Sequence, residues 1–390
     1  MKRILVVMWL LAQGAVAQVK NGDVVPDLSF RLLNAPVKTT SMAELKGKVV
    51  MIEFWATWCG SCIAAMPHLK ELQAKYPKQL RIISVSQETP KRILQFLKAR
   101  PSEVWFASDS LLSISTAFPH HIIPHTVLIS PDGRLVANTS PELVTEAVIG
   151  KLLKKQEIKV EEKTDNTLTY EEIINSYFHA DDSVKRRFLI QPKIKGAPGF
   201  STTYQDNSTF SGRRLTAVNC GLSNLYRMAY GDFPYNRTLD KIPASEKNAY
   251  CIDLIVPRQK ELLAELKKEL AVRFDVHAEV RPELKDTYAL RIADAEKVKK
   301  IPQNTSGVRT YSARHGAVDQ QSMTMEDLAA YLESFGVSHI PVVDETNNTT
   351  KYDIQFTFQP EDPSSLTKAL ADMGLELVKT KKELAILYLW

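Results

Sequence analysis

The strongest chemical signal in the sequence is the pentapeptide Trp58-Cys59-Gly60-Ser61-Cys62. It follows an apolar, β-prone run and precedes a segment with helical spacing, so we expect it at a strand-to-helix junction. A thiolate at a helix N-terminus is stabilised by free backbone N–H groups and by the positive end of the helix dipole. The spacing therefore predicts thiol–disulfide exchange, in which Cys59 attacks a substrate disulfide and Cys62 resolves the mixed disulfide.

Two other interpretations of the cysteine pair are a structural disulfide and half of a metal site. A metal site would need two more soft ligands, and the sequence has neither a second CxxC nor a nearby Cys/His cluster. The strand–motif–helix context favours redox chemistry over both alternatives. We expect no metal and no other cofactor.

The elements around the motif predict an α/β fold, because apolar strands alternate with helices. The expected strands are Val49–Ala56, Leu80–Val85, and a hairpin of Thr126–Ser130 with Arg134–Ala137. The expected helices are Cys59–Tyr76, Lys91–Arg100 and Glu142–Lys154.

The run Gly47-Lys48-Val49-Val50, the segment Phe54 to Cys59 and the pair Met66-Pro67 together resemble a known family. They are similar to thioredoxin-fold proteins of the TlpA/ResA type, which are exported bacterial thiol–disulfide oxidoreductases. The resemblance covers about Val24 to Lys154. It implies a central sheet flanked by helices, and it matches Pro67 to the proline that kinks the active-site helix.

The same resemblance implies a substrate-binding surface. The Ile123-Pro124 pair matches the cis-proline that faces the active-site sulfurs and exposes a strand edge to an extended substrate. Trp58, Gly60 and Ser61 are expected to complete this surface. His120, His121 and His125 make the proline loop unusual for the family, and we expect them to be solvated rather than to bind a metal.

Two carboxylates match acids of the family. Glu53 corresponds to the buried acid of thioredoxins, where desolvation would raise its pKa and let it relay a proton to or from Cys62. Its apolar neighbours leave the burial ambiguous, because alternate strand residues face opposite ways. Glu88 corresponds to the active-site glutamate of ResA-like proteins. For each, a surface or salt-bridged carboxylate is the alternative.

The N-terminus has the pattern of a signal peptide. Lys2 and Arg3 precede the apolar run Ile4 to Ala12 and the small-residue site Ala15-Val16-Ala17. We expect cleavage after Ala17, with an uncleaved anchor helix as the alternative. No later apolar run is long enough to span a membrane. The mature protein is expected to be periplasmic or secreted, with no stable membrane insertion, where a disulfide can persist.

Length and composition predict a multidomain globular protein. The chain has 390 residues, of which 44% are hydrophobic and 24% charged. A net charge of +5 without a long basic block gives no basis for nucleic-acid binding. We expect a signal peptide (1–17), a redox domain (18–154), a charged linker (155–169) and a C-terminal domain (170–390).

The C-terminal domain is predicted to be α+β, with two β-α-β-β repeats. The first repeat would comprise strand Tyr250–Leu254, helix Arg258–Phe274 and strands near Val276–Val280 and Tyr288–Ile292. The second would comprise strand Tyr352–Phe356, helix Ser364–Met373 and strands near Leu375–Lys379 and Leu384–Leu389.

This region resembles an uncharacterised domain family common in secreted proteins of soil bacteria. The resemblance rests on Arg214 to Asn219, Leu225 to Tyr230, Leu270 to His277 and Pro341 to Asp344, and it implies no activity. Asp253 is interpreted as a strand-end or turn residue rather than a catalytic acid.

Cys220 and Cys251 form a second cysteine pair in the C-terminal domain. They could form a structural disulfide in an oxidising compartment, or remain two unpaired buried thiols. Spacing does not decide between these alternatives, because a disulfide depends on geometry.

Taken together, the motifs predict an exported thiol–disulfide oxidoreductase that acts on protein thiols or disulfides. An upstream, membrane-linked thiol donor would reduce it again. The alternative is an envelope binding or scaffold protein, in which the C-terminal domain recognises a partner and the redox domain is accessory. A thiol peroxidase is disfavoured, because it needs a single peroxidatic cysteine in a different loop.

Overall fold

The structure is a computed structural model that describes residues 18–204, 209–243, 248–314, 316–335 and 340–390. The expected signal peptide lies outside the described residues. The chain divides into two compact units, and the boundary between them along the sequence falls between Thr164 and Asp165. None of the helices within the described ranges combines the length and apolarity of a membrane span.

The N-terminal unit is built on a five-stranded mixed sheet in the order β5-β4-β3-β6-β7. Strands β3, β4 and β5 are parallel, whereas β6 is antiparallel to both β3 and β7. The strands are β3 (Val49–Phe54), β4 (Leu80–Ser86), β5 (Trp105–Ser108), β6 (His125–Ile129) and β7 (Leu135–Thr139). This sheet confirms the thioredoxin-like α/β expectation and the β6–β7 hairpin.

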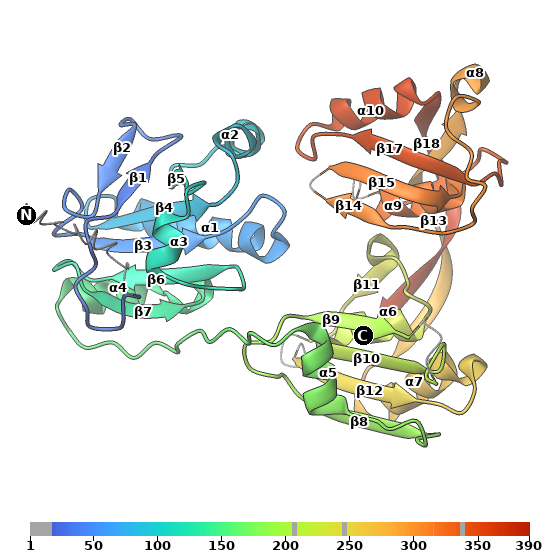
Figure 1. Cartoon of the computed structure of the whole chain (residues 1–390), viewed down its shortest axis with the longest axis horizontal. Coiled ribbons are helices and arrows are strands. Elements are labelled where there is room, and N and C mark those ends of the chain that lie inside the picture. Colours follow the sequence, from blue (N-terminus) through green and yellow to red (C-terminus); the bar gives the residue numbers. More distant parts are fainter. Residues whose placement is uncertain (1–17, 205–208, 244–247, 315, 336–339) are drawn as a thin grey trace, which may run out of the picture. The chain divides into compact units, whose positions relative to one another are not determined.

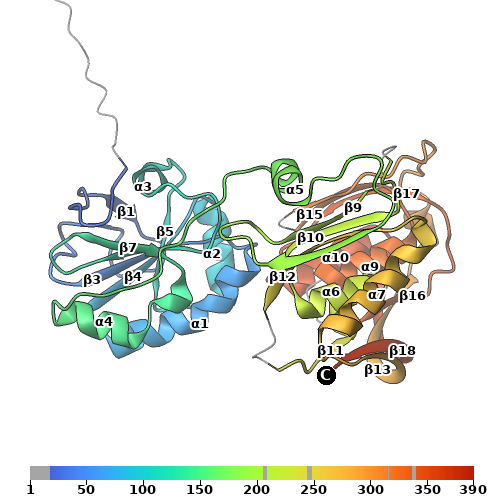
Figure 2. The ribbon, with the colours of Figure 1, turned by 90° about the horizontal axis from the view of Figure 1, so that it is seen from below.

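Both faces of this sheet are covered, which explains why β3 reads as a continuous apolar run. Met51 packs with side chains of α1 (Gly60–Lys75), α2 (Pro90–Ala99) and α4 (Glu146–Leu153). Ile52 packs on the opposite face, under α3 and the β1–β2 hairpin (Figure 2). The remaining elements are α3 (Ser113–Ala117), β1 (Ser29–Arg31), β2 (Thr39–Ser41) and the short 3₁₀ helix η1 (Pro141–Leu143).

The C-terminal unit contains several sheets with helices, as the α+β prediction requires. Its first lobe has the sheet β8-β12-β10-β9 and its second lobe the sheet β14-β15-β17. The strands are β8 (Arg187–Pro192), β9 (Phe200–Thr203), β10 (Arg214–Gly221), β12 (Ala249–Ile255), β14 (Ser312–Arg314), β15 (Ala317–Met323) and β17 (Tyr352–Thr357). The helices are α5 (Tyr170–Phe178), α6 (Leu222–Ala229), α7 (Leu262–Arg273), α8 (Ala295–Val298), α9 (Met325–Phe335) and α10 (Pro363–Asp372).

The two lobes are joined by a long antiparallel ribbon of β13 (Ala278–Ile292) and β18 (Leu375–Leu389) (Figure 1). Short parallel strands flank it, with β11 (Thr238–Asp240) on β18 and β16 (Val342–Asp344) on β13. Leu387 and Leu389 at one end pack in the first lobe, and Leu290 and Leu375 at the other end pack in the second.

The predicted β-α-β-β repeats are therefore wrong in their last part, since each expected strand pair is one 15-residue strand. Polar residues such as Glu283 and Lys382 lie in the middle of each long strand. In the structure the partner strand pairs with the backbone along the whole length, so these side chains lie on the ribbon without ending it. The duplication itself is present, because both halves run strand, helix, short strand, strand, helix, long strand.

The second cysteine pair is not a disulfide, since Cys220 and Cys251 are free thiols. They lie in neighbouring strands but join different hydrophobic clusters. Cys251 packs with residues such as Ile173, whereas Cys220 packs against the cluster of Leu222. The two thiols therefore stay unbonded to each other in neighbouring strands.

Candidate active site

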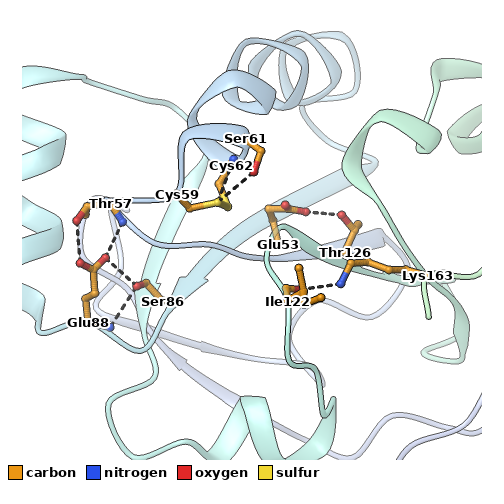
Figure 3. Close-up of a disulfide and its surroundings, with 10 residues drawn as sticks. All are labelled: Glu53, Thr57, Cys59, Ser61, Cys62, Ser86, Glu88, Ile122, Thr126 and Lys163. Atoms are coloured by element: carbon orange, nitrogen blue, oxygen red, sulfur yellow. Dashed lines mark hydrogen bonds between the residues drawn. A yellow bond between two sulfur atoms is a disulfide. The ribbon is translucent and has the colours of Figure 1, made fainter. Parts of the chain in front are cut away.

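The predicted redox pair lies at the N-terminus of α1, where Cys59 and Cys62 form a disulfide (Figure 3). Cys59 is the N-cap residue, and the Cys62 amide donates a hydrogen bond to its sulfur over 3.2 Å. The Ser61 hydroxyl lies 3.5 Å from the same sulfur. These donors can hold negative charge on Cys59 when the disulfide is reduced.

The sulfurs sit at the base of a partly open surface. Cys59 is 5% exposed, whereas the adjacent Trp58 is 50% exposed. A cavity of about 350 Å³ reaches Trp58 of the motif and is lined among others by Phe54, Glu88, His121 and Ile123. The predicted substrate-binding residues Trp58 and Ile123 therefore share one concave surface.

The Ile123–Pro124 peptide bond is cis, as the family resemblance implied. Pro124 comes directly before β6, the strand that pairs with β3 in the middle of the sheet. Gly60 and Ser61 begin α1 on the other side of the disulfide. Gly60 has open space around its Cβ position, so the start of the helix is not crowded there.

Glu53 is buried in β3, which settles the ambiguity that the sequence left. Its strand neighbours Met51 and Trp55 pack in the same cluster as the two cysteines, so Glu53 faces the disulfide side of the sheet. Burial raises the pKa of Glu53 to about 8, against the lowering effect of a hydrogen bond donated by the Thr126 hydroxyl. Its Oε1 atom has no hydrogen-bond partner among the described residues, an arrangement that favours a neutral carboxyl at pH 7.

Glu88 holds the loop that leads into the CxxC motif. One carboxylate oxygen accepts a hydrogen bond from the Thr57 amide and the other accepts one from the Thr57 hydroxyl, both over 2.7 Å. The Ser86 hydroxyl donates a third, over 3.2 Å. Thr57 lies just before Trp58 and Cys59, so these hydrogen bonds fix the backbone that leads into the motif.

The loop histidines differ from the expectation that they are solvated. His125 is buried and His120 is half-buried, and their rings stack with centroids 5.0 Å apart. The ring of His120 also lies 4.2 Å from that of Phe54, and only His121 is exposed. No group of three or more potential metal ligands occurs within the described part of the chain.

Sequence analysis missed Lys163, which the structure places at this site. Its ammonium group donates a hydrogen bond to the Ile122 carbonyl over 2.6 Å (Figure 3). Lys163 lies in the stretch interpreted as a linker, where one lysine among several charged residues carries no local signal. The only hint was the apolar pair Ile158 and Val160 within that charged stretch.

Comparison with known proteins places this site in a family. Residues 20–153 match the family described as Redoxin. The chain is 33% identical over 128 residues to the thiol-disulfide oxidoreductase ResA of Bacillus cereus, which covers 32% of this chain and 74% of the relative. The chain belongs to the family of ResA-like thiol–disulfide oxidoreductases.

Other similar proteins share only part of the chain. The ResA protein of Oceanobacillus iheyensis is 30% identical over 118 residues, or 29% of this chain, and this chain spans 62% of that relative. A crystal structure of the thioredoxin domain of a thiol-disulfide oxidoreductase from Bacteroides vulgatus is 22% identical, with a TM-score of 0.30 over 35% of this chain and 99% of that one.

The C-terminal unit has a separate match. Residues 239–389 match the family described as "Protein of unknown function (DUF3738)". This confirms the resemblance to an uncharacterised domain, and it assigns no chemistry to that unit. The ResA-like redox unit is therefore the part of the chain to which an activity can be attached.

Proposed function

We propose that the protein is an exported thiol–disulfide oxidoreductase that reduces disulfides in protein substrates. The observation that carries the proposal is the Cys59–Cys62 disulfide at the N-terminus of α1, on the same sheet face as Glu53 and next to the cis Ile123–Pro124 bond. This combination supplies a nucleophile, a resolving thiol, a proton relay and a strand edge for the substrate.

The reaction begins with the reduced protein, whose Cys59 thiolate attacks one sulfur of a substrate disulfide. A bond forms between Cys59 and that sulfur, and the other substrate sulfur leaves as a thiolate that takes up a proton. Cys62 then attacks the Cys59 sulfur, which releases the second substrate thiol and forms the Cys59–Cys62 disulfide. Two electrons pass from the protein to the substrate.

Glu53 has a defined task in the return step. A donor thiolate attacks Cys59 of the oxidised protein, and Cys62 leaves as a thiolate. Because burial raises the pKa of Glu53 to about 8, its carboxyl is mostly protonated at pH 7 and can supply a proton to the departing sulfur. We propose that the donor is a thiol protein linked to the membrane.

Insulin reduction with a dithiol donor tests this function. Wild-type protein should reduce insulin, Cys59→Ser should be inactive, and Cys62→Ser should accumulate a mixed disulfide between Cys59 and an insulin chain, detected by mass spectrometry. Cys220→Ser is the matched control, because it removes a free thiol of the other unit, and it should retain full activity. Undiminished activity of Cys59→Ser would overturn the proposal.

Export is a proposal supported by the basic, apolar and small-residue pattern of residues 1–17. The mature product should begin at Gln18. Mass spectrometry of the intact chain from the extracytoplasmic fraction measures this directly, and a full-length mass with Met1 retained would contradict cleavage.

A further inference from the structure

The segment that joins the two units, residues 156–169, packs against the redox unit in its first part. Residues 156–169 up to the start of α5 contain no helix or strand. Ile158 and Val160 nevertheless pack against the hydrophobic cluster that contains Cys59 and Cys62, while the alternate residues Lys159 and Glu161 are exposed. This alternation is what an extended chain shows when one side lies on a protein surface.

Hydrogen bonds fix the same segment to the edge of the sheet. The Lys163 amide donates to the Asn138 carbonyl over 2.9 Å, and the Thr139 hydroxyl donates to the Glu161 carbonyl over 2.7 Å. Asn138 and Thr139 belong to β7, the last strand of the sheet order. The segment therefore lies along β7 and is held there by one backbone hydrogen bond and by one hydrogen bond from the Thr139 hydroxyl.

These anchors carry the Lys163 side chain to the active-site loop. Its ammonium group donates to the carbonyl of Ile122, the residue directly before the cis Ile123–Pro124 pair. Lys163 is half-buried, so the contact is partly shielded from solvent. A residue of the joining segment thus holds the backbone directly before the cis-proline, and Figure 3 shows its hydrogen bond to Ile122.

The charge of Lys163 also acts on Glu53. Besides desolvation and the Thr126 hydrogen bond, two charged groups influence the pKa of Glu53. Glu142 of η1 raises it and Lys163 lowers it. The cysteines on α1, which face the same side of the sheet, are joined as a disulfide and do not titrate. Lys163 is therefore the cation that offsets part of the burial and of the Glu142 charge.

We propose that Lys163 is a positioning residue for thiol–disulfide exchange, which holds the cis-proline loop through the Ile122 carbonyl and brings a positive charge to that loop. The inference rests on the proposed function. The Redoxin match ends at residue 153, so this contribution comes from outside the matched region. Shortly after Lys163, the Asn166 amide donates to the Gly196 carbonyl of the C-terminal unit.

The test uses the full chain with Lys163→Met, Lys163→Arg and the matched control Lys159→Met, which changes an exposed lysine of the same segment. The first readout is the titration of the Glu53 carboxyl in the oxidised protein by carbon NMR, assigned with Glu53→Gln. Lys163→Met should shift the Glu53 midpoint upward by about 0.5 to 1 pH unit, the scale of one partly screened charge. Lys163→Arg should stay near the wild-type midpoint, and Lys159→Met should not move it.

The second readout is the steady-state reduction of insulin. Because the loop presents the substrate edge, Lys163→Met should raise KM several-fold with a smaller change in kcat, and Lys163→Arg should restore it in part. An unchanged Glu53 midpoint together with an unchanged KM in Lys163→Met would overturn the inference. Failure of the proposed function is a different result, namely no exchange activity in the wild type while the NMR titration still responds to Lys163.

Discussion

Each unit of the chain buries one carboxylate in the middle of a sheet, and the two are satisfied in opposite ways. Glu53 of the redox unit has the Thr126 hydroxyl on one oxygen and no hydrogen-bond partner among the described residues on the other. Asp253 of the C-terminal unit is equally buried, but it accepts hydrogen bonds from Arg187 and Arg214 and from the Thr216 hydroxyl.

The difference separates a reactive group from a structural one. Burial raises the pKa of Glu53 to about 8, so this carboxyl is mostly neutral at pH 7 and suited to exchange a proton. A carboxyl group bonded to two guanidinium groups holds parts of the fold together. Arg187 and Arg214 also donate to the Phe178 carbonyl, so the Asp253 cluster ties α5 to its sheet.

The comparison predicts its largest effect for Glu53, on how the free energy of unfolding of the N-terminal unit depends on pH. The folded-state pKa of Glu53 is raised from 4.5 to about 8, so the native protein binds this proton more tightly than the unfolded chain does. The resulting stability is complete below pH 4.5 and is lost as the pH rises through about 8. Over this window the N-terminal unit should lose on the order of 5 kcal/mol relative to Glu53→Gln.

Urea unfolding from pH 5 to 8.5, followed by tryptophan fluorescence, measures this difference. Trp55 and Trp58 lie next to the site and report on the N-terminal unit. Glu53→Gln should show a flatter stability profile than the wild type across the same pH range. Parallel profiles for the two proteins would mean that Glu53 is an ordinary carboxylate, and the contrast with Asp253 would disappear.

A somewhat smaller effect is expected when Asp253 is neutralised. Asp253→Asn leaves two guanidinium groups without their counter-charge, and breaking a buried ion pair in this way costs about 3–5 kcal/mol. Hydrogen exchange of the full chain should show weaker protection in β10 and β12, while insulin reduction is unchanged. Asp372→Asn is the control, since it removes an exposed ion pair with Lys368 and should cost about 0–1 kcal/mol. Equal protection in the two variants would contradict a structural role for Asp253.

The sequence predicted the parts of the site that are set by local spacing. Spacing and context predicted the redox pair Cys59 and Cys62, and the family resemblance implied the cis-proline and the acid six residues before Cys59. Asp253, in contrast, was assigned to a strand end or turn, because the two arginines that stabilise it are distant in sequence. The structure places it inside β12, in a position that only tertiary contacts explain.

Features that depend on long-range pairing were not predictable from local patterns. The polar middle of β13 resembles a turn until β18 pairs with it along its full length. The joining segment resembles a solvated linker until its backbone bonds to Asn138 and Thr139 become visible. Lys163 therefore enters the site through contacts that no local sequence pattern encodes.

The central claim is that Cys59 is the attacking sulfur, and the most direct test is competitive alkylation of the fully reduced chain. Limiting iodoacetamide at pH 7, followed by peptide mass spectrometry, ranks all four thiols in one reaction. The account predicts that Cys59, at the N-terminus of α1, is modified first and that Cys62, Cys220 and Cys251 follow much more slowly. Modification of Cys62 before Cys59, or equal rates for all four thiols, would contradict it.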